Sequence, residues 1–124
     1  MTLIACGGIV QHALDAADTL AQEGILVRVL SMHTLKPIDT QGIVQAVQET
    51  GGIITIEEHS VYGGLSAIVS QVCMDHGQHP KFFHAIALRQ GFSTVVGSQE
   101  YLRKYNGIHR DVILAKVKDH IRPS

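Results

Sequence analysis

Four nearly continuous apolar runs constrain the fold of this chain more than any other feature of the sequence. They are TLIACGG from Thr2, ILVRVLSM from Ile25, IITIEE from Ile53 and KFFHAIAL from Lys81. Strands buried on both faces have this composition, whereas strands with one solvated face alternate apolar and polar residues. The runs therefore predict a parallel sheet that is covered on both faces.

The segments between the runs have the spacing of amphipathic helices. We expect Asp39 to cap the second helix and Gly51 to end it. After the fourth run, Ser98 is expected to cap a short helix that ends at Asn106 and Gly107, before a separate last helix. The residues predicted to face inward are Val10, Ala13, Leu14, Ala17, Leu20, Ala21, Ile43, Val44, Val47, Leu65, Ile68, Val69, Val72, Cys73, Val112, Ile113, Val117 and Ile121.

Strands that alternate with helices at this spacing predict one α/β domain over residues 1–124, in three layers, because each right-handed crossover lays its helix on the sheet. A chain of 124 residues can bury a core without a metal or a disulfide. The first strand begins abruptly at Thr2, which suggests a piece of a longer chain.

The composition excludes several classes of partner. The formal charge is −1, with ten basic and eleven acidic residues, so neither nucleic acid nor an anionic membrane is expected to bind. No apolar run approaches the ~20 residues that span a bilayer, and no signal-peptide pattern is found, so we expect a cytoplasmic protein. Cys6 and Cys73 are expected to be buried, inert thiols rather than a disulfide.

Two glycine pairs follow the first and third runs, where ligands collect in open parallel sheets. Gly7, Gly8, Gly63 and Gly64, together with His59, form a candidate anion site, since helix N-termini there present free N–H groups. Neither pair belongs to a nucleotide-binding glycine motif, and glycines at such turns often serve only the tight bend. The structural role is the favoured interpretation.

The polar stretch EEHS from Glu57 could hold an acid, a base and a nucleophile. Glu57 and Glu58 point to opposite faces of a strand, and nothing local orients His59 or forms an oxyanion site for Ser60. We therefore expect the carboxylates to end the strand in solvent or at an interface. His59 and Ser60 are expected to cap the turn into the next helix.

Two further groups of basic or metal-ligating residues have weaker signals. Cys73, His76 and His79 are spaced like zinc ligands, with His84 as a conceivable fourth, but the partner C-x-x-C is missing and zinc is not expected. His33 and Lys36 lie together in a connector after the second run. Charged connector residues are common, so this pair is only suggestive.

Three stretches in this order resemble the C-terminal domain of the transketolase family. They are VRVLSMHTLKPID, GGIITIEEHSVYGGLSAIV and GSQEYLRKYNG, and the resemblance covers essentially the whole chain. Within the family the chain looks closest to bacterial and archaeal transketolases encoded as separate subunits. 1-deoxy-D-xylulose-5-phosphate synthase and the beta subunits of 2-oxoacid dehydrogenases are relatives.

The resemblance implies a five-stranded mixed sheet whose first, antiparallel strand precedes Thr2. The four strands present here would then lie in the order two, one, three, four, with the reversal between the loops at Gly7 and Gly63. Cutting such a domain free would leave the edge from Ile25 to Leu30 open. Self-association is expected through this edge and the segment from Phe92 to Tyr105.

For function, the resemblance implies two-carbon ketol transfer between sugar phosphates by an intact, dimeric enzyme that uses thiamine diphosphate and magnesium. The cofactor lies between diphosphate-binding and pyrimidine-binding domains that this chain lacks, so no catalytic or cofactor-binding residue is assigned here. The expected role is assembly, dimerisation and regulation, with those domains or their subunit as partners. The alternative is a free-standing module that binds a small anion or nucleotide between Gly7 and Gly63.

Overall fold

The computed structural model describes residues 1–6, 9–32, 39–58, 64–88 and 99–121, without the side chains of Glu58, Leu88 and residues 99–109. Strands and helices alternate along it. The strands are β1 (Thr2–Cys6), β2 (Arg28–Met32), β3 (Gly52–Glu58) and β4 (Phe82–Leu88). The helices are α1 (Ile9–Gln22), α2 (Thr40–Thr50), α3 (Gly64–Asp75) and α4 (Gln99–Ile121). Among the described helices, none has the length and apolarity needed to cross a membrane.

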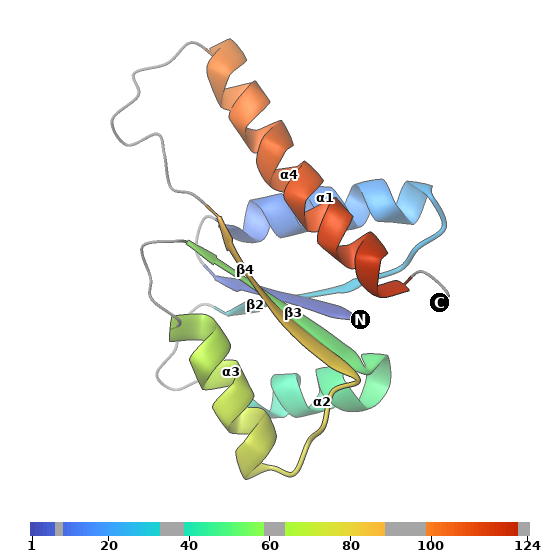
Figure 1. Cartoon of the computed structure of the whole chain (residues 1–124), viewed down its shortest axis with the longest axis vertical. Coiled ribbons are helices and arrows are strands. Elements are labelled where there is room, and N and C mark those ends of the chain that lie inside the picture. The colour runs from blue at the N-terminus through green and yellow to red at the C-terminus, as the bar shows by residue number, and fades with distance from the viewer. Residues whose placement is uncertain (7–8, 33–38, 59–63, 89–98, 122–124) are drawn as a thin grey trace.

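The four strands form a parallel sheet in the order β2-β1-β3-β4, as expected (Figure 1). Thr2 pairs with Arg28 on one side and with Ile53 on the other, and Gly52 pairs with Phe82. Helices α1 and α4 cover one face of the sheet, and α2 and α3 cover the opposite face. The predicted three-layer α/β architecture is confirmed.

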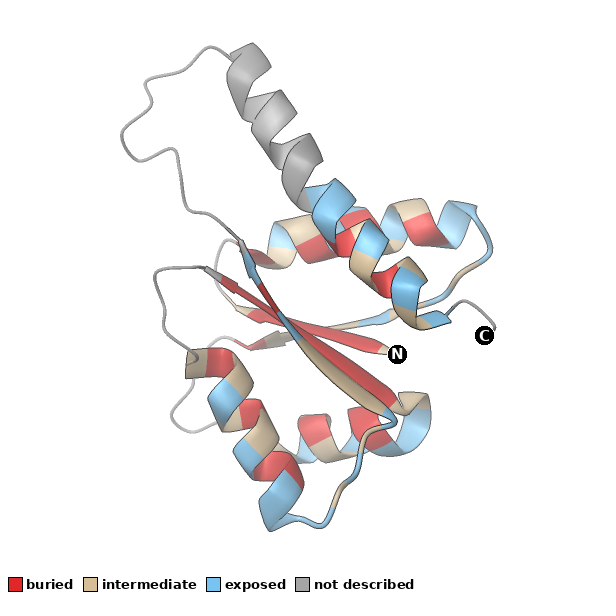
Figure 2. Ribbon diagram, viewed as in Figure 1, coloured by how far each residue is buried: buried red, intermediate tan, exposed pale blue. Residues whose placement is uncertain are grey.

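The side chains of the central strands alternate between two cores. Leu3 and Ala5 of β1 pack toward α1 and α4, whereas Ile4 packs toward α2 and α3. In β3, Ile54 belongs to the first core and Ile53 to the second. All five are fully buried, and each large aliphatic side chain contributes about 1.5–3 kcal/mol on burial (Figure 2).

Helix α1 faces the sheet with a narrower stripe than the sequence predicted. Ala13 and Leu20 are buried, but Ile9 and Ala16 complete the stripe, at i, i+4, i+7 and i+11. Leu14 is 45% exposed and Ala21 is also exposed, so their predicted inward positions were wrong. The prediction began the stripe at Val10 instead of Ile9, and so extended it to the side of the helix that carries Leu14 and Ala21.

Helix α4 is one continuous element, which corrects the prediction of two helices separated at Asn106 and Gly107. A glycine inside a helix costs only about 1 kcal/mol relative to alanine, which does not by itself break a helix. Ile113 and Val117 are fully buried one turn apart. Val112 and Ile121, also predicted to face inward, are exposed instead.

Helix α2 begins and ends as its sequence predicts. The Asp39 carboxylate accepts a hydrogen bond from the Gly42 N–H at 3.0 Å, which satisfies one of the free donors of the first turn. Gly51 closes the helix with φ of 82°, a left-handed conformation that glycine adopts without steric cost. Both boundary predictions are confirmed.

One buried hydroxyl lacks a partner, and this gives a stability prediction. Thr55 Oγ1 on β3 is buried without a hydrogen bond, so Thr55→Val should raise the free energy of unfolding by about 1 kcal/mol. The matched control is Thr2→Val, because the equally buried Thr2 hydroxyl lies 2.8 Å from the Thr50 hydroxyl. That substitution should lower the free energy of unfolding by about 1 kcal/mol. Urea denaturation measures the free energy of unfolding of both variants. A Thr55→Val variant no more stable than wild type would contradict the conclusion that Thr55 Oγ1 is a buried hydroxyl without a hydrogen bond.

Candidate functional site

The candidate site lies at the carboxyl ends of β1 and β3, between which the strand order reverses. Of the five residues predicted there, the structure describes Gly64, which begins α3. Gly7, Gly8, His59 and Gly63 lie outside the described residues. The start of α3 is therefore the part of the predicted anion site that the structure describes.

Glu57, at the end of β3, reaches the first turn of α3. Its Oε1 accepts a hydrogen bond from the Leu65 N–H at 3.2 Å, and its Oε2 accepts one from the Ser66 N–H at 3.1 Å. The residue is only 4% exposed. A carboxylate in this position satisfies two free donors and neutralises the positive end of the helix dipole.

The buried position of Glu57 corrects the expectation that this carboxylate ends the strand in solvent or at an interface. Its role in capping α3 was assigned instead to His59 and Ser60, which lie outside the described residues. The strand period could have revealed it, because Ile53, Thr55 and Glu57 share the face that packs on α2 and α3. A carboxylate on that face, shortly before a helix start, has the helix N–H groups as its nearest donors.

Occupation by Glu57 limits what else can bind at this end of the sheet. An external anion at the start of α3 would compete with a tethered carboxylate for the N–H groups of Leu65 and Ser66. The start of α3 is thus closed by the protein itself. An anion site formed with Gly7 and Gly8 stays a prediction.

The residues with zinc-like spacing point to different parts of the molecule. Cys73 is buried between α3 and the sheet, His76 and His79 are exposed, and His84 shares the opposite face of the sheet with Phe82. Among the described residues, no three metal-ligating side chains gather into a site. His33 and Lys36 lie outside the described part of the chain.

The two cysteines differ in their surroundings. No disulfide joins Cys6 to Cys73. Cys73 is buried as predicted, and burial raises the pKa of its thiol, which keeps it in the unreactive protonated form. Cys6, at the end of β1, is half-buried, so the prediction of full burial was wrong for this residue.

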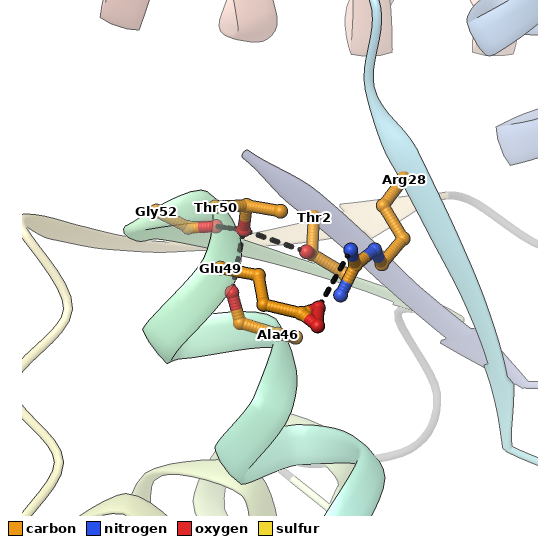
Figure 3. Close-up of polar contacts among 6 residues, drawn as sticks. All are labelled: Thr2, Arg28, Ala46, Glu49, Thr50 and Gly52. Atoms are coloured by element: carbon orange, nitrogen blue, oxygen red, sulfur yellow. Dashed lines mark hydrogen bonds and ion pairs between the residues drawn. The ribbon is translucent and has the colours of Figure 1, made fainter.

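The opposite end of the sheet carries an open hollow of about 560 Å³. Its lining combines apolar and charged residues near the beginnings of β1 and β2, namely Met1, Leu26, Val27, Arg28, Glu49 and Thr50. Arg28 and Glu49 form an ion pair at 3.0 Å with both side chains about half exposed, which stabilises the fold little (Figure 3).

A short chain of hydroxyl groups lies beside the Arg28–Glu49 ion pair (Figure 3). The Thr50 hydroxyl donates to the Ala46 carbonyl at 2.6 Å, which leaves the Thr2 hydroxyl to donate to Thr50 at 2.8 Å. These bonds tie β1 to the last turn of α2. They serve the fold and place no nucleophile beside a base.

Comparison with known proteins agrees with this architecture. Residues 1–113 match the family described as "Transketolase, C-terminal domain". The chain belongs to the transketolase family, as a C-terminal domain. It is 32% identical over 114 residues to one subunit of the apulose-4-phosphate transketolase of Actinobacillus succinogenes, covering 92% of this chain. It is 37% identical over 125 residues to transketolase-like protein 2 of Mus musculus, covering 98% of this chain.

A solved structure described as a split gene transketolase, inactive beta4 tetramer, superposes with a TM-score of 0.73 at 33% identity, over 95% of this chain. The transketolase resemblance is therefore confirmed, as is the strand order that it implied for the four strands present; the fifth, antiparallel strand stays a prediction. The chain spans only 36% of the Actinobacillus protein, 19% of the mouse protein and 38% of the solved chain.

The Glu57 contact leads to a direct stability test of this transketolase domain. Glu57→Gln removes the negative charge and turns an amide group toward N–H donors, so the free energy of unfolding should fall by about 2 kcal/mol. Glu49→Gln is the matched control, because its ion pair is half exposed and should be worth less than about 1 kcal/mol. Urea denaturation at neutral pH compares them, and equal losses in the two variants would count against the capping role.

Proposed function

We propose that this chain is the single C-terminal domain, over residues 1–124, of a thiamine-diphosphate-dependent transketolase. The intact enzyme would transfer a two-carbon ketol unit between sugar phosphates. This domain would contribute to assembly, dimerisation and regulation and hold no catalytic residue. The main support is the match of residues 1–113 to the family, together with the likeness to subunits of split transketolases.

We propose that Glu57 does not serve the thiamine diphosphate cofactor. Activation of that cofactor needs a glutamate that is free to contact its pyrimidine ring, whereas the Glu57 carboxylate bonds the N–H groups of Leu65 and Ser66. Among the described residues no acidic cluster offers a magnesium site. From the family match, we assign the cofactor and its metal to the diphosphate-binding and pyrimidine-binding domains, in the same chain or in a partner subunit.

This assignment predicts how the chain behaves alone. Titration calorimetry with thiamine diphosphate and magnesium should give no saturable heat, and a coupled assay with sugar phosphates should show no ketol transfer. An intact split transketolase, assembled from both subunits, is the positive control in both measurements. Saturable cofactor binding in the low micromolar range would contradict the proposal.

The surface through which we expect the isolated chain to associate lies along β2. This strand is an edge of the described sheet, so one side of its backbone has no neighbouring strand there. Leu26 is 84% exposed at the margin of the 560 Å³ hollow. An open strand edge beside exposed apolar surface favours association with protein, and the balanced charge of the chain gives no attraction to nucleic acid or membranes.

Self-association tests this surface. The isolated chain should show a molecular mass that rises with concentration in light scattering, and Leu26→Lys should lower that mass because a charge at the strand edge opposes pairing. Met74→Lys is the matched control, since Met74 is 74% exposed on α3, across the sheet. A strict monomer at high micromolar concentration, or equal effects of the two variants, would exclude the β2 surface.

The predicted contact from Phe92 to Tyr105 falls outside the described side chains.

The alternative of a free-standing anion or nucleotide module has less support, because Glu57 already occupies the start of α3. Binding of inorganic phosphate by the wild-type chain, abolished by substitution of Gly8, would favour it.

A cytoplasmic location also stays a prediction from composition.

A further inference from the structure

Three aromatic rings join β4 to the last turns of α4. Phe82 and His84 lie on the same face of β4, and His120 of α4 packs against both. The Phe82 and His120 rings stack with centroids 4.4 Å apart and an angle of 28°. The His84 and His120 rings are tilted at 47° with centroids 5.5 Å apart. We refer to these three residues as the ring cluster.

The orientation of His120 is fixed from within its own helix. Its Nδ1 lies 2.8 Å from the Lys116 carbonyl, and because a carbonyl only accepts, Nδ1 carries the proton of this hydrogen bond. The ring is thereby held against Phe82 and His84.

Two other contacts hold this half of α4 in place. Ile113 and Val117 are fully buried in the core with α1. Lys118 forms an ion pair with Glu23 at 3.0 Å, but both side chains are roughly 40% exposed, so this pair adds little. The ring cluster adds a direct contact between the last turns of α4 and β4.

The charges around His84 favour its neutral form. Burial lowers the pKa of His84, the positive charges of Lys116 and His120 lower this pKa further, and the Asp119 carboxylate opposes them. The unfolded chain keeps the ordinary histidine pKa of about 6.5, so it takes up a proton at a higher pH than the folded chain. Stabilisation by neutral His84 is therefore present above about pH 6.5 and is lost as pH falls through the lower, folded pKa.

We propose that the ring cluster of Phe82, His84 and His120 is a proton-sensitive contact that holds the C-terminal half of α4 on β4 at neutral pH and loosens on acidification. Protonation of His84 sets a new cation beside Lys116 and His120, and the Asp119 carboxylate offsets part of this positive charge. Repulsion between these positive charges then opposes the contact of the His84 and His120 rings, which holds this end of α4 on β4. Local opening of α4 would expose the apolar surface around Ile113 and Val117. Acidification could then change which proteins bind to this face of the domain.

Amide hydrogen exchange on the full chain at pH 7.5 and 5.0 tests the proposal, with rates divided by the intrinsic rate at each pH. Protection in α4 from residue 113 to 121 should fall by a larger factor than protection in α3, on the order of threefold more, because the ring cluster contacts α4 and not α3. His84→Phe keeps an aromatic ring and removes the proton, so it should abolish most of this difference. His84→Gln replaces it if the phenylalanine variant does not fold.

Two further variants separate the ring cluster from general acid sensitivity. Burial also lowers the pKa of His12 on α1, with Asp15 opposing, so His12→Gln should reduce the overall pH dependence of stability but keep the α4-specific loss. His76→Gln at the exposed end of α3 should change neither. In a proton NMR titration, the His84 ring should titrate below the ordinary value of about 6.5. Equal losses in α3 and α4, an unchanged loss in both His84 variants, or a His84 midpoint at or above 6.5 would each overturn the proposal.

Discussion

The burial of β1 and β3 on both faces is the constraint on which the rest of this structure depends. Leu3, Ile4, Ile53 and Ile54 have no exposed surface, so each face of the central pair needs a covering layer. Two helices on each side supply it, and parallel pairing follows because every strand is reached through a crossover helix. The carboxyl ends of the strands then lie together at one end of the sheet, and their beginnings lie at the opposite end. The predicted anion site is at the first of these ends and the open hollow at the second.

Within that frame, a position that binds ligands in many open α/β sheets is filled internally. The N–H groups at the start of α3 face the carboxylate of Glu57, which the preceding strand delivers at fixed register. A charge that is expensive to bury is tolerated because it has two donors and a helix dipole. Polar residues beside a strand end can therefore serve architecture, and only their partners separate this role from catalysis.

The sequence predicted the strands, their α/β layering and the caps of α2 because these depend on local composition and period. Strand order followed from the transketolase resemblance rather than from any local pattern. Glu57 was expected in solvent or at an interface because its partners lie eight and nine residues further on, and carboxylates are usually exposed. The single helix α4 was missed because a glycine penalty of about 1 kcal/mol is small beside the burial of Ile113 and Val117.

The bonds from Glu57 to α3 also decide how this part of the molecule comes apart. The first turn of a helix normally frays, since its N–H groups have no partner inside the helix. Here fraying of Leu65 and Ser66 would leave the buried Glu57 carboxylate without its two hydrogen bonds. That carboxylate could regain hydrogen bonds with water only if β3 opened as well. The start of α3 and the end of β3 are thereby joined into one cooperative unit, whose amides exchange only when the centre of the sheet itself unfolds.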